Sequence, residues 1–126
     1  MALDYGAART GVAVSDATGT IARPVGVVDR ASSPAGIEAL LALVREHDVQ
    51  SVVVGLPLTL RGERGQQAIE TETFVDALRE AVDIPVETYD ERFTTALAAR
   101  GGGAAEEDAR AAAHLLETYL ANARRE

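Results

Sequence analysis

The first sixteen residues read Met1-Ala-Leu-Asp-Tyr-Gly-Ala-Ala-Arg-Thr-Gly-Val-Ala-Val-Ser-Asp16. They predict two short apolar strands, at residues 3–5 and 11–14, joined by a tight turn that contains glycine and arginine. Asp4 is a carboxylate inside the first strand, where burying an uncompensated charge costs several kcal/mol. A metal ion, another cation or a metal-linked phosphate would compensate it, so Asp4 is the first candidate site residue.

The rest of the chain alternates strand and helix patterns. Residues 20–28 predict a third strand, which Pro24 favours at the edge of a sheet. Ser33 and Pro34 are typical of a helix start, and apolar residues at helical spacing continue this helix to about His47. The later predicted elements are a buried strand at 51–54, a helix at 68–82, a strand at 85–89, a short helix at 94–100, a flexible glycine segment at 101–103 and a helix at 108–123.

This element order predicts an α/β fold with a five-stranded mixed sheet. The first three strands follow one another closely and are expected to form an antiparallel meander. Right-handed crossovers make the first, fourth and fifth strands parallel. The predicted strand order is therefore 3-2-1-4-5, with helices on both faces and a single domain over residues 1–126.

Composition excludes several function classes. The chain has no cysteine, so disulfide and thiolate chemistry are excluded. No apolar run reaches membrane-spanning length and no leader pattern begins the chain, so we expect a cytoplasmic protein with no membrane partner. The net charge of -8 argues against non-specific nucleic-acid binding, but a nuclease can gather a local cluster from its 12 basic residues, all of them arginine.

The carboxyl ends of the parallel strands are the expected place for a ligand. Asp4 lies near the end of the first strand, and a loop beginning at Gly55 leaves the fourth. Asp90, Glu91 and Arg92 follow the fifth strand. We therefore expect these residues at the same end of the sheet, with Asp90 and Glu91 facing opposite ways if the strand is regular.

Asp108 is expected to join them from the terminal helix. It shares one helical stripe with small and apolar residues that would pack on the sheet, namely Ala111, Ala112, Leu115 and Tyr119. A carboxylate in the first turn is also stabilised by the helix dipole. Position alone leaves two interpretations equally open, a site residue or simply a capping or first-turn residue.

Separated carboxylates without nearby histidine or cysteine favour a hard cation such as Mg²⁺ or Mn²⁺. Two such ions can activate water and stabilise the leaving oxygen in phosphodiester hydrolysis. Arginines expected near the same end would hold phosphates, although each alone is an ordinary surface residue. These arginines are Arg9, Arg61, Arg64, Arg92 and Arg100.

Together these residues resemble the YqgF family, also called RuvX, which is described both as Holliday junction resolvases and as pre-16S rRNA nucleases. Four motifs in the correct order carry the resemblance over essentially the whole chain. They are residues 3–16, residues 53–58 with Gly62 and Gly65, residues 90–95, and residues 108–120. The resemblance implies an RNase H-like fold and a metal-dependent endonuclease, a hydrolase that processes the 5′ end of pre-16S rRNA in ribosome biogenesis.

The resemblance also implies site residues. Its acidic triad falls on Asp4, Glu91 and Asp108, with Asp90 as the substitute metal ligand if the strand has already ended. Asp16 belongs to the first motif, but it follows the second strand and is interpreted as a turn residue. The implied partners are pre-rRNA or branched DNA and precursor ribosomal particles, with the protein acting as a monomer or a homodimer.

The chain departs from the family pattern in three places. Only three residues precede Asp4, so either the first strand is short or the start of the sequence is misassigned. The loop after the fourth strand reads Thr59-Leu-Arg61, where many members carry an Asn-Met-Asp type of sequence. The segment at 101–108 is short and not basic, which bears on substrate affinity rather than on the metal site.

Three alternatives to rRNA processing remain open from the sequence. Holliday junction cleavage is the closest, because phosphate and metal contacts carry no base information, and paired cuts would favour a two-fold dimer. An ATP-binding domain of the actin and sugar-kinase type would also begin with an Asp-x-Gly hairpin, matched by residues 4–6, but the chain has no second such motif. A non-catalytic RNA-binding assembly factor is the third, and the acidic net charge argues against it.

Overall fold

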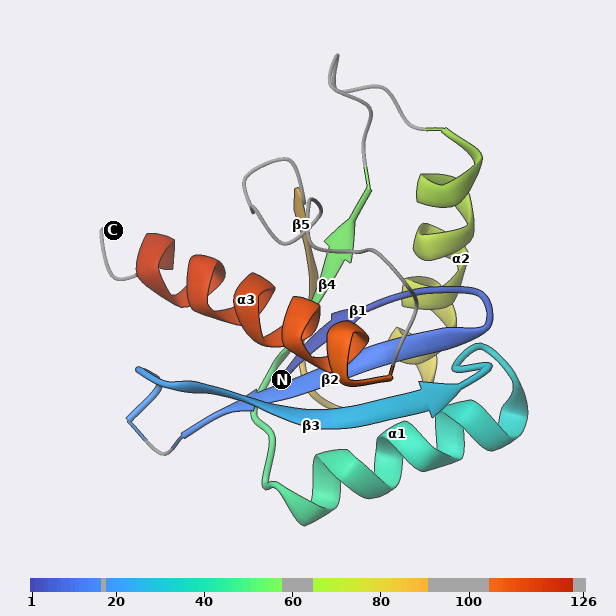
Figure 1. Cartoon of the computed structure of the whole chain (residues 1–126). Helices are drawn as coiled ribbons and strands as arrows, with labels where there is room; N and C mark the ends of the chain where they lie inside the picture. The colour runs from blue at the N-terminus through green and yellow to red at the C-terminus, as the bar shows by residue number, and fades with distance from the viewer. Residues whose placement is uncertain (17, 58–64, 91–104, 124–126) are drawn as a thin grey trace.

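The computed structural model describes residues 1–16, 18–57, 65–90 and 105–123 (Figure 1). In chain order, the elements of this part of the chain are β1 (Ala2–Asp4), β2 (Arg9–Ser15), β3 (Ala22–Asp29), α1 (Pro34–Glu46), β4 (Val52–Leu56), α2 (Gln66–Ala81), β5 (Val86–Asp90) and α3 (Ala105–Ala123). The helix predicted at 94–100 and the flexible segment predicted at 101–103 lie outside the described residues.

The strands form one sheet with the order β3-β2-β1-β4-β5. β2 pairs antiparallel with both β1 and β3, whereas β4 pairs parallel with β1 and with β5. The predicted strand order and directions are therefore confirmed, and Pro24 lies in the edge strand β3 as expected. β1 is short, with three residues.

The two faces of the sheet are covered by different helices (Figure 1). On one face, α1 and α2 cover the main core, which includes Leu3 and Phe74. On the other face, α3 packs on Ala2 and Ala13. Because successive strand side chains point to opposite faces, Asp4 shares the α3 face with Ala2.

Small side chains line the contact between α3 and the sheet. Ala112 of α3 and Ala2 and Ala13 of the strands are fully buried in the same cluster. The distance between packed elements depends on the size of the side chains at their contact. Alanine on both sides therefore lets the backbone of α3 lie close to β1 and β2.

α3 begins at Ala105, three residues before the predicted start. Its first turn holds Glu106, Glu107 and Asp108, whose negative charges interact favourably with the helix dipole. Asp108 is thus a first-turn residue, and the alternative that it caps the helix is wrong. The extra residues are Ala105, Glu106 and Glu107, which extend the helix before the predicted start.

α1 and α2 are fixed at their ends by specific hydrogen bonds. The predicted start of α1 is confirmed, since the Ser33 hydroxyl accepts a hydrogen bond from the Gly36 amide at 3.0 Å. α2 is tied to β5 by Arg79, whose Nε and Nη2 donate to the Val86 carbonyl at 3.0 and 2.8 Å.

In the described part of the chain, no helix has the length and apolar character needed to cross a bilayer.

Candidate active site

Asp4 is a buried carboxylate at the carboxyl end of β1. Only 6% of the residue is exposed. The next residue, Tyr5, stacks on Phe74 of α2 with ring centroids 4.5 Å apart, which anchors it to the opposite face of the sheet. Asp4 is therefore directed to the α3 face, in an environment where a charge requires compensation.

Gly11 brings the first turn of α3 next to Asp4. Gly11 is the register partner of Asp4 across the β1–β2 pair. A Cβ added to Gly11 would lie 1.9 Å from the carbonyl oxygen of Asp108 and 3.1 Å from the backbone nitrogen of Ala109. Only glycine permits this approach, so the backbone of Asp108 lies against β2 at the residue beside Asp4. The backbone of Asp108 thus lies close to β1, and the shared site role of Asp4 and Asp108 stays a prediction.

Arg9 forms an ion pair with Asp108. Its Nε lies 3.0 Å from Oδ2 of Asp108, and the two side chains are 34% and 21% exposed. The turn before Arg9 is closed by the buried hydroxyl of Thr10. This hydroxyl accepts a hydrogen bond from the Gly6 amide and donates one to the Gly6 carbonyl, each at 3.4 Å. A Cβ on Gly6 would come within 2.5 Å of the Arg9 carbonyl oxygen, so this tight turn sets where Arg9 begins β2.

Asp90 is the last residue of β5 and lies at the same end of the sheet. It pairs in register with Leu56, the last residue of β4. Two alternate positions of β5 contact α3: Glu87 accepts a hydrogen bond from the Tyr119 hydroxyl at 3.2 Å, and Tyr89 meets the Tyr119 ring edge-on. Strand alternation therefore assigns Asp90 to the face opposite Asp4. Because β5 includes Asp90, the condition set for using it as the substitute ligand is not met.

The remaining predicted site residues lie outside the described part of the chain. They are Glu91, Arg61, Arg64, Arg92 and Arg100. Within the described ranges, no group of three or more histidine, cysteine, aspartate or glutamate side chains is placed to hold a metal ion. The described part of the predicted triad is the pair Asp4 and Asp108, and the role of Glu91 stays a prediction.

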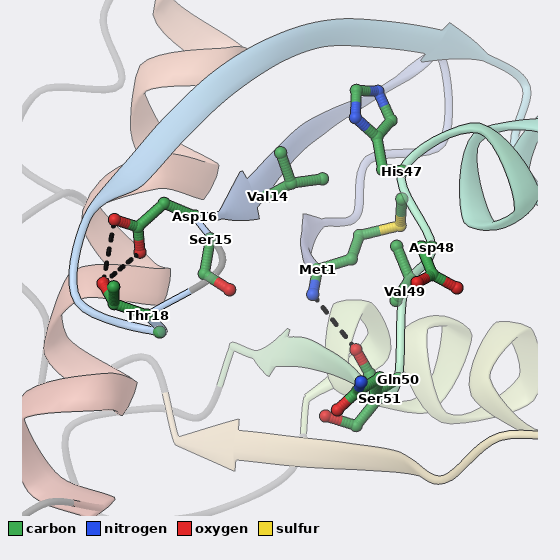
Figure 2. Close-up of a pocket in the computed structure, with 11 residues that line it drawn as sticks. Met1, Val14, Ser15, Asp16, Thr18, His47, Asp48, Val49, Gln50 and Ser51 are labelled. Carbon is green, nitrogen blue, oxygen red and sulfur yellow. Dashed lines mark hydrogen bonds between the residues drawn. The ribbon is translucent and has the colours of Figure 1, made fainter.

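A pocket of about 540 Å³ is lined by Met1, which precedes β1, so it lies at the opposite end of that strand from Asp4. Figure 2 shows Met1 and Asp16 among the residues around this pocket. Asp16 lines it and belongs to the β2–β3 turn, as predicted. Its carboxylate accepts hydrogen bonds from the amides of Thr20 (3.0 Å) and Ile21 (3.2 Å) and from the Thr18 hydroxyl (2.9 Å). These bonds, chiefly the one from Thr20, hold the pKa of the Asp16 carboxyl below its ordinary value. Asp16 thus stabilises the turn and is remote from the candidate site.

The donor set beside Gly11 fits a hard divalent cation. Asp4 and Asp108 supply only carboxylate oxygens, which Mg²⁺ and Mn²⁺ prefer. The burial of Asp4 gives a bound cation an electrostatic role, because it would offset a charge held away from water. The two residues are set on rigid elements, a central strand and a helix packed on it.

Two features of the site were not predicted. The sequence predicts Gly11 only as a strand residue, although a glycine inside a strand is a known sign of close backbone approach. It predicts a phosphate contact for Arg9, whereas the structure pairs Arg9 with Asp108. No local sequence pattern predicts the Arg9–Asp108 ion pair, because the two residues are far apart in the sequence.

Comparison with protein families gives one match over nearly the whole chain. The family model described as "RuvX: Holliday junction resolvase" matches residues 1–122. A protein of Chloroflexus aurantiacus (strain ATCC 29366 / DSM 635 / J-10-fl) named "Putative pre-16S rRNA nuclease" is 47% identical over 98 residues, which cover 78% of this chain and 64% of that protein. The chain thus spans slightly less than two thirds of this relative. A protein of the same name from Natranaerobius thermophilus is 37% identical, covering 95% of this chain and 92% of its own length.

Comparison with solved structures agrees with the sheet order. T. thermophilus RuvC in complex with a Holliday junction substrate superposes with a TM-score of 0.60 and 20% sequence identity, covering 98% of this chain and 92% of that chain. At this identity the likeness concerns the fold alone. The prediction of an RNase H-like fold is confirmed.

Proposed function

The chain belongs to the RuvX (YqgF) family, and from this premise we propose that it is a divalent-metal-dependent endonuclease acting on structured nucleic acid. The observation that carries the proposal is the contact between Gly11 and Asp108. That contact places the backbone of Asp108, an acidic residue of the first turn of α3, against the strand residue that pairs with the buried Asp4. This arrangement supports a shared site for these two acidic residues at the sheet edge where ligands bind sheets with parallel strands.

In the proposed site, Asp4, Glu91 and Asp108 hold Mg²⁺ or Mn²⁺. When bound, the metal supplies a water of lowered pKa and stabilises negative charge on phosphate oxygens. The chain itself fixes the ligands: β1 holds Asp4 under α3, and the packing of α3 on Gly11 fixes the backbone of Asp108. Asp90 is the weaker candidate for the metal because its strand position assigns it to the other face.

We propose that the substrate is pre-16S rRNA, cut near its 5′ end in the cytoplasm as part of a precursor ribosomal particle. The names of the relatives from Chloroflexus and Natranaerobius support this choice over DNA. With a net charge of -8, the protein cannot rely on a general positive surface to hold RNA. Phosphate contacts are therefore assigned to local arginines, namely Arg9, Arg61, Arg64 and Arg92.

Holliday junction cleavage is the second candidate function. The description of the matching family model favours it, and RuvC shares the fold. Cutting a four-way junction symmetrically would need a homodimer, whereas trimming one RNA end needs only a monomer. Oligomeric state and substrate preference therefore distinguish the two candidates together.

The test is to offer a pre-16S rRNA fragment and a four-way DNA junction in parallel, with Mg²⁺, Mn²⁺ or EDTA. We expect the RNA to be cut with either ion and not with EDTA. Loss of an outer partner of a metal ligand typically costs about 10- to 100-fold, so Asp4→Asn is expected to lower the rate at least that much. Arg110→Gln is the control, because Arg110 is exposed and pairs with Glu106 away from the proposed ligands.

Each other outcome has a definite meaning. Cleavage that persists in EDTA and in Asp4→Asn overturns the metal mechanism. Cutting of the junction alone favours the resolvase function. RNA binding without cleavage of either substrate favours the non-catalytic assembly factor.

A further inference from the structure

The Arg9–Asp108 ion pair sets a fixed positive charge beside a proposed metal ligand. Arg9 Nε lies 3.0 Å from Asp108 Oδ2. Arg9 and Gly11 are alternate residues of β2 and therefore share the α3 face. Gly11 is in turn the register partner of Asp4. Arg9 and Asp4 therefore lie on the same face of the sheet, and the backbone of Asp108 packs against Gly11 on that face.

Among the described residues, the first turn of α3 contributes acidic side chains to the area around Arg9. Glu106 and Glu107 accompany Asp108 in the first turn of α3, and Asp4 is buried close to that turn. Like charges brought together disfavour the ionised state unless a cation offsets them. Arg110, on the same part of α3, lies 3.8 Å from Glu106 instead.

We propose that Arg9 is a positioning residue that stands in for the divalent cation. This inference rests on the proposed metal-dependent function. In the metal-free protein, Arg9 fixes the position of the Asp108 carboxylate, and it competes with an incoming cation for that carboxylate. Once Asp108 is bound to metal, the guanidinium becomes available for the phosphate contact predicted for Arg9.

The size of the effect follows from the exposure of the pair. Arg9 and Asp108 are partly solvated, so their attraction is modest. Removing the positive charge is expected to tighten metal binding about two- to fivefold, the range of a weak ion pair. Salt screens exposed charges, so the gain is expected to shrink between about 0.05 M and about 0.5 M NaCl.

The experiment is calorimetric titration of the full chain with MnCl₂, without nucleic acid. The variants are Arg9→Gln, which removes the charge but keeps a hydrogen-bond donor, and Arg9→Lys, which keeps the charge. Arg110→Gln is the control: it makes the same change in net charge on the same helix, but Arg110 pairs with Glu106 and not with Asp108. We expect tighter Mn²⁺ binding in Arg9→Gln only, and a lower melting temperature in EDTA for that variant.

The other results overturn the inference in distinguishable ways. Unchanged Mn²⁺ affinity in Arg9→Gln makes Arg9 a phosphate contact alone. Weaker binding in both Arg9→Gln and Arg9→Lys makes it a scaffold for the ligand without competition. An equal gain in Arg110→Gln reduces the effect to net charge. If the wild type and every variant bind no Mn²⁺, the proposed metal site fails, and the role of Arg9 fails with it.

Discussion

Replacing Gly11 with alanine adds one methyl group where β2 meets the first turn of α3. The new Cβ would lie 1.9 Å from the Asp108 carbonyl oxygen, whereas real Cβ contacts stay above 3.0 Å. The neighbouring atoms belong to the backbone of a helix, so they cannot avoid the methyl group by rotating. The first turn of α3 is therefore expected to move away from the sheet by about 1 Å.

Two effects of this shift can be estimated. Overpacking of a well-packed contact costs about 1–3 kcal/mol of unfolding free energy. For a chain of this length, that corresponds to a melting temperature lower by roughly 4–15 °C. A misplacement of about 1 Å at a catalytic site can lower the rate about 100-fold, because Asp108 would no longer lie against the residue beside Asp4.

Urea unfolding in EDTA and RNA cleavage with Mg²⁺ measure these effects separately. The control is Gly65→Ser, since Gly65 precedes α2 in an extended conformation with no atom within 4 Å of an added Cβ. A serine there can cap the helix, so its stability is expected to be equal or slightly higher. If Gly11→Ala keeps both wild-type stability and wild-type activity, the close contact between α3 and β2 does not determine the position of Asp108 in the site.

Three further outcomes are expected. Asp4→Asn in EDTA should match or exceed the wild type in melting temperature, because a neutral isostere is easier to bury; a large decrease would mean that the charge stabilises the metal-free fold. Asp16→Ala should be less stable at neutral pH. The pKa of the Asp16 carboxyl is lowered on folding, so its stabilisation is present above the ordinary pKa of 3.8 and is lost as pH falls through the folded value; urea unfolding from pH 7 down to below 3.8 should show the gap narrowing, and a constant gap contradicts this. Arg79→Ala should lose about 1 kcal/mol by urea unfolding, since the Val86 carbonyl loses two donors from a half-exposed side chain; an unchanged midpoint would show that this link adds nothing.

Local features of the fold could be predicted because neighbouring residues determine them. Ser33 and Pro34 mark the start of α1 through a hydrogen bond and a fixed φ that involve only adjacent positions. The sheet order could be predicted from the short connections of the first three strands and from the general preference for right-handed crossovers. The start of α3 was predicted three residues too late, because Glu106 and Glu107 suit either a solvated loop or the first turn of a helix.

The site was only partly predictable because its details depend on tertiary contacts. Helix periodicity correctly turned Asp108 toward the sheet, and the unusual position of Asp4 marked the strand end. The ion pair between Arg9 and Asp108 depends on the position of α3 along β2, and no spacing in the sequence predicts that position. A single sequence also cannot tell that Gly11 serves a helix from elsewhere in the chain.

The alanine-lined contact under α3 restricts how this protein can adapt to heat. Proteins often gain thermal stability when larger side chains fill their cores. At Ala13 or Ala112, both fully buried, a larger residue would lift α3 and carry Asp108 away from Asp4. Homologues living at high temperature are therefore expected to gain their stability on the face covered by α1 and α2, where Leu40 and Phe74 pack. They are expected to keep small side chains between α3 and the sheet.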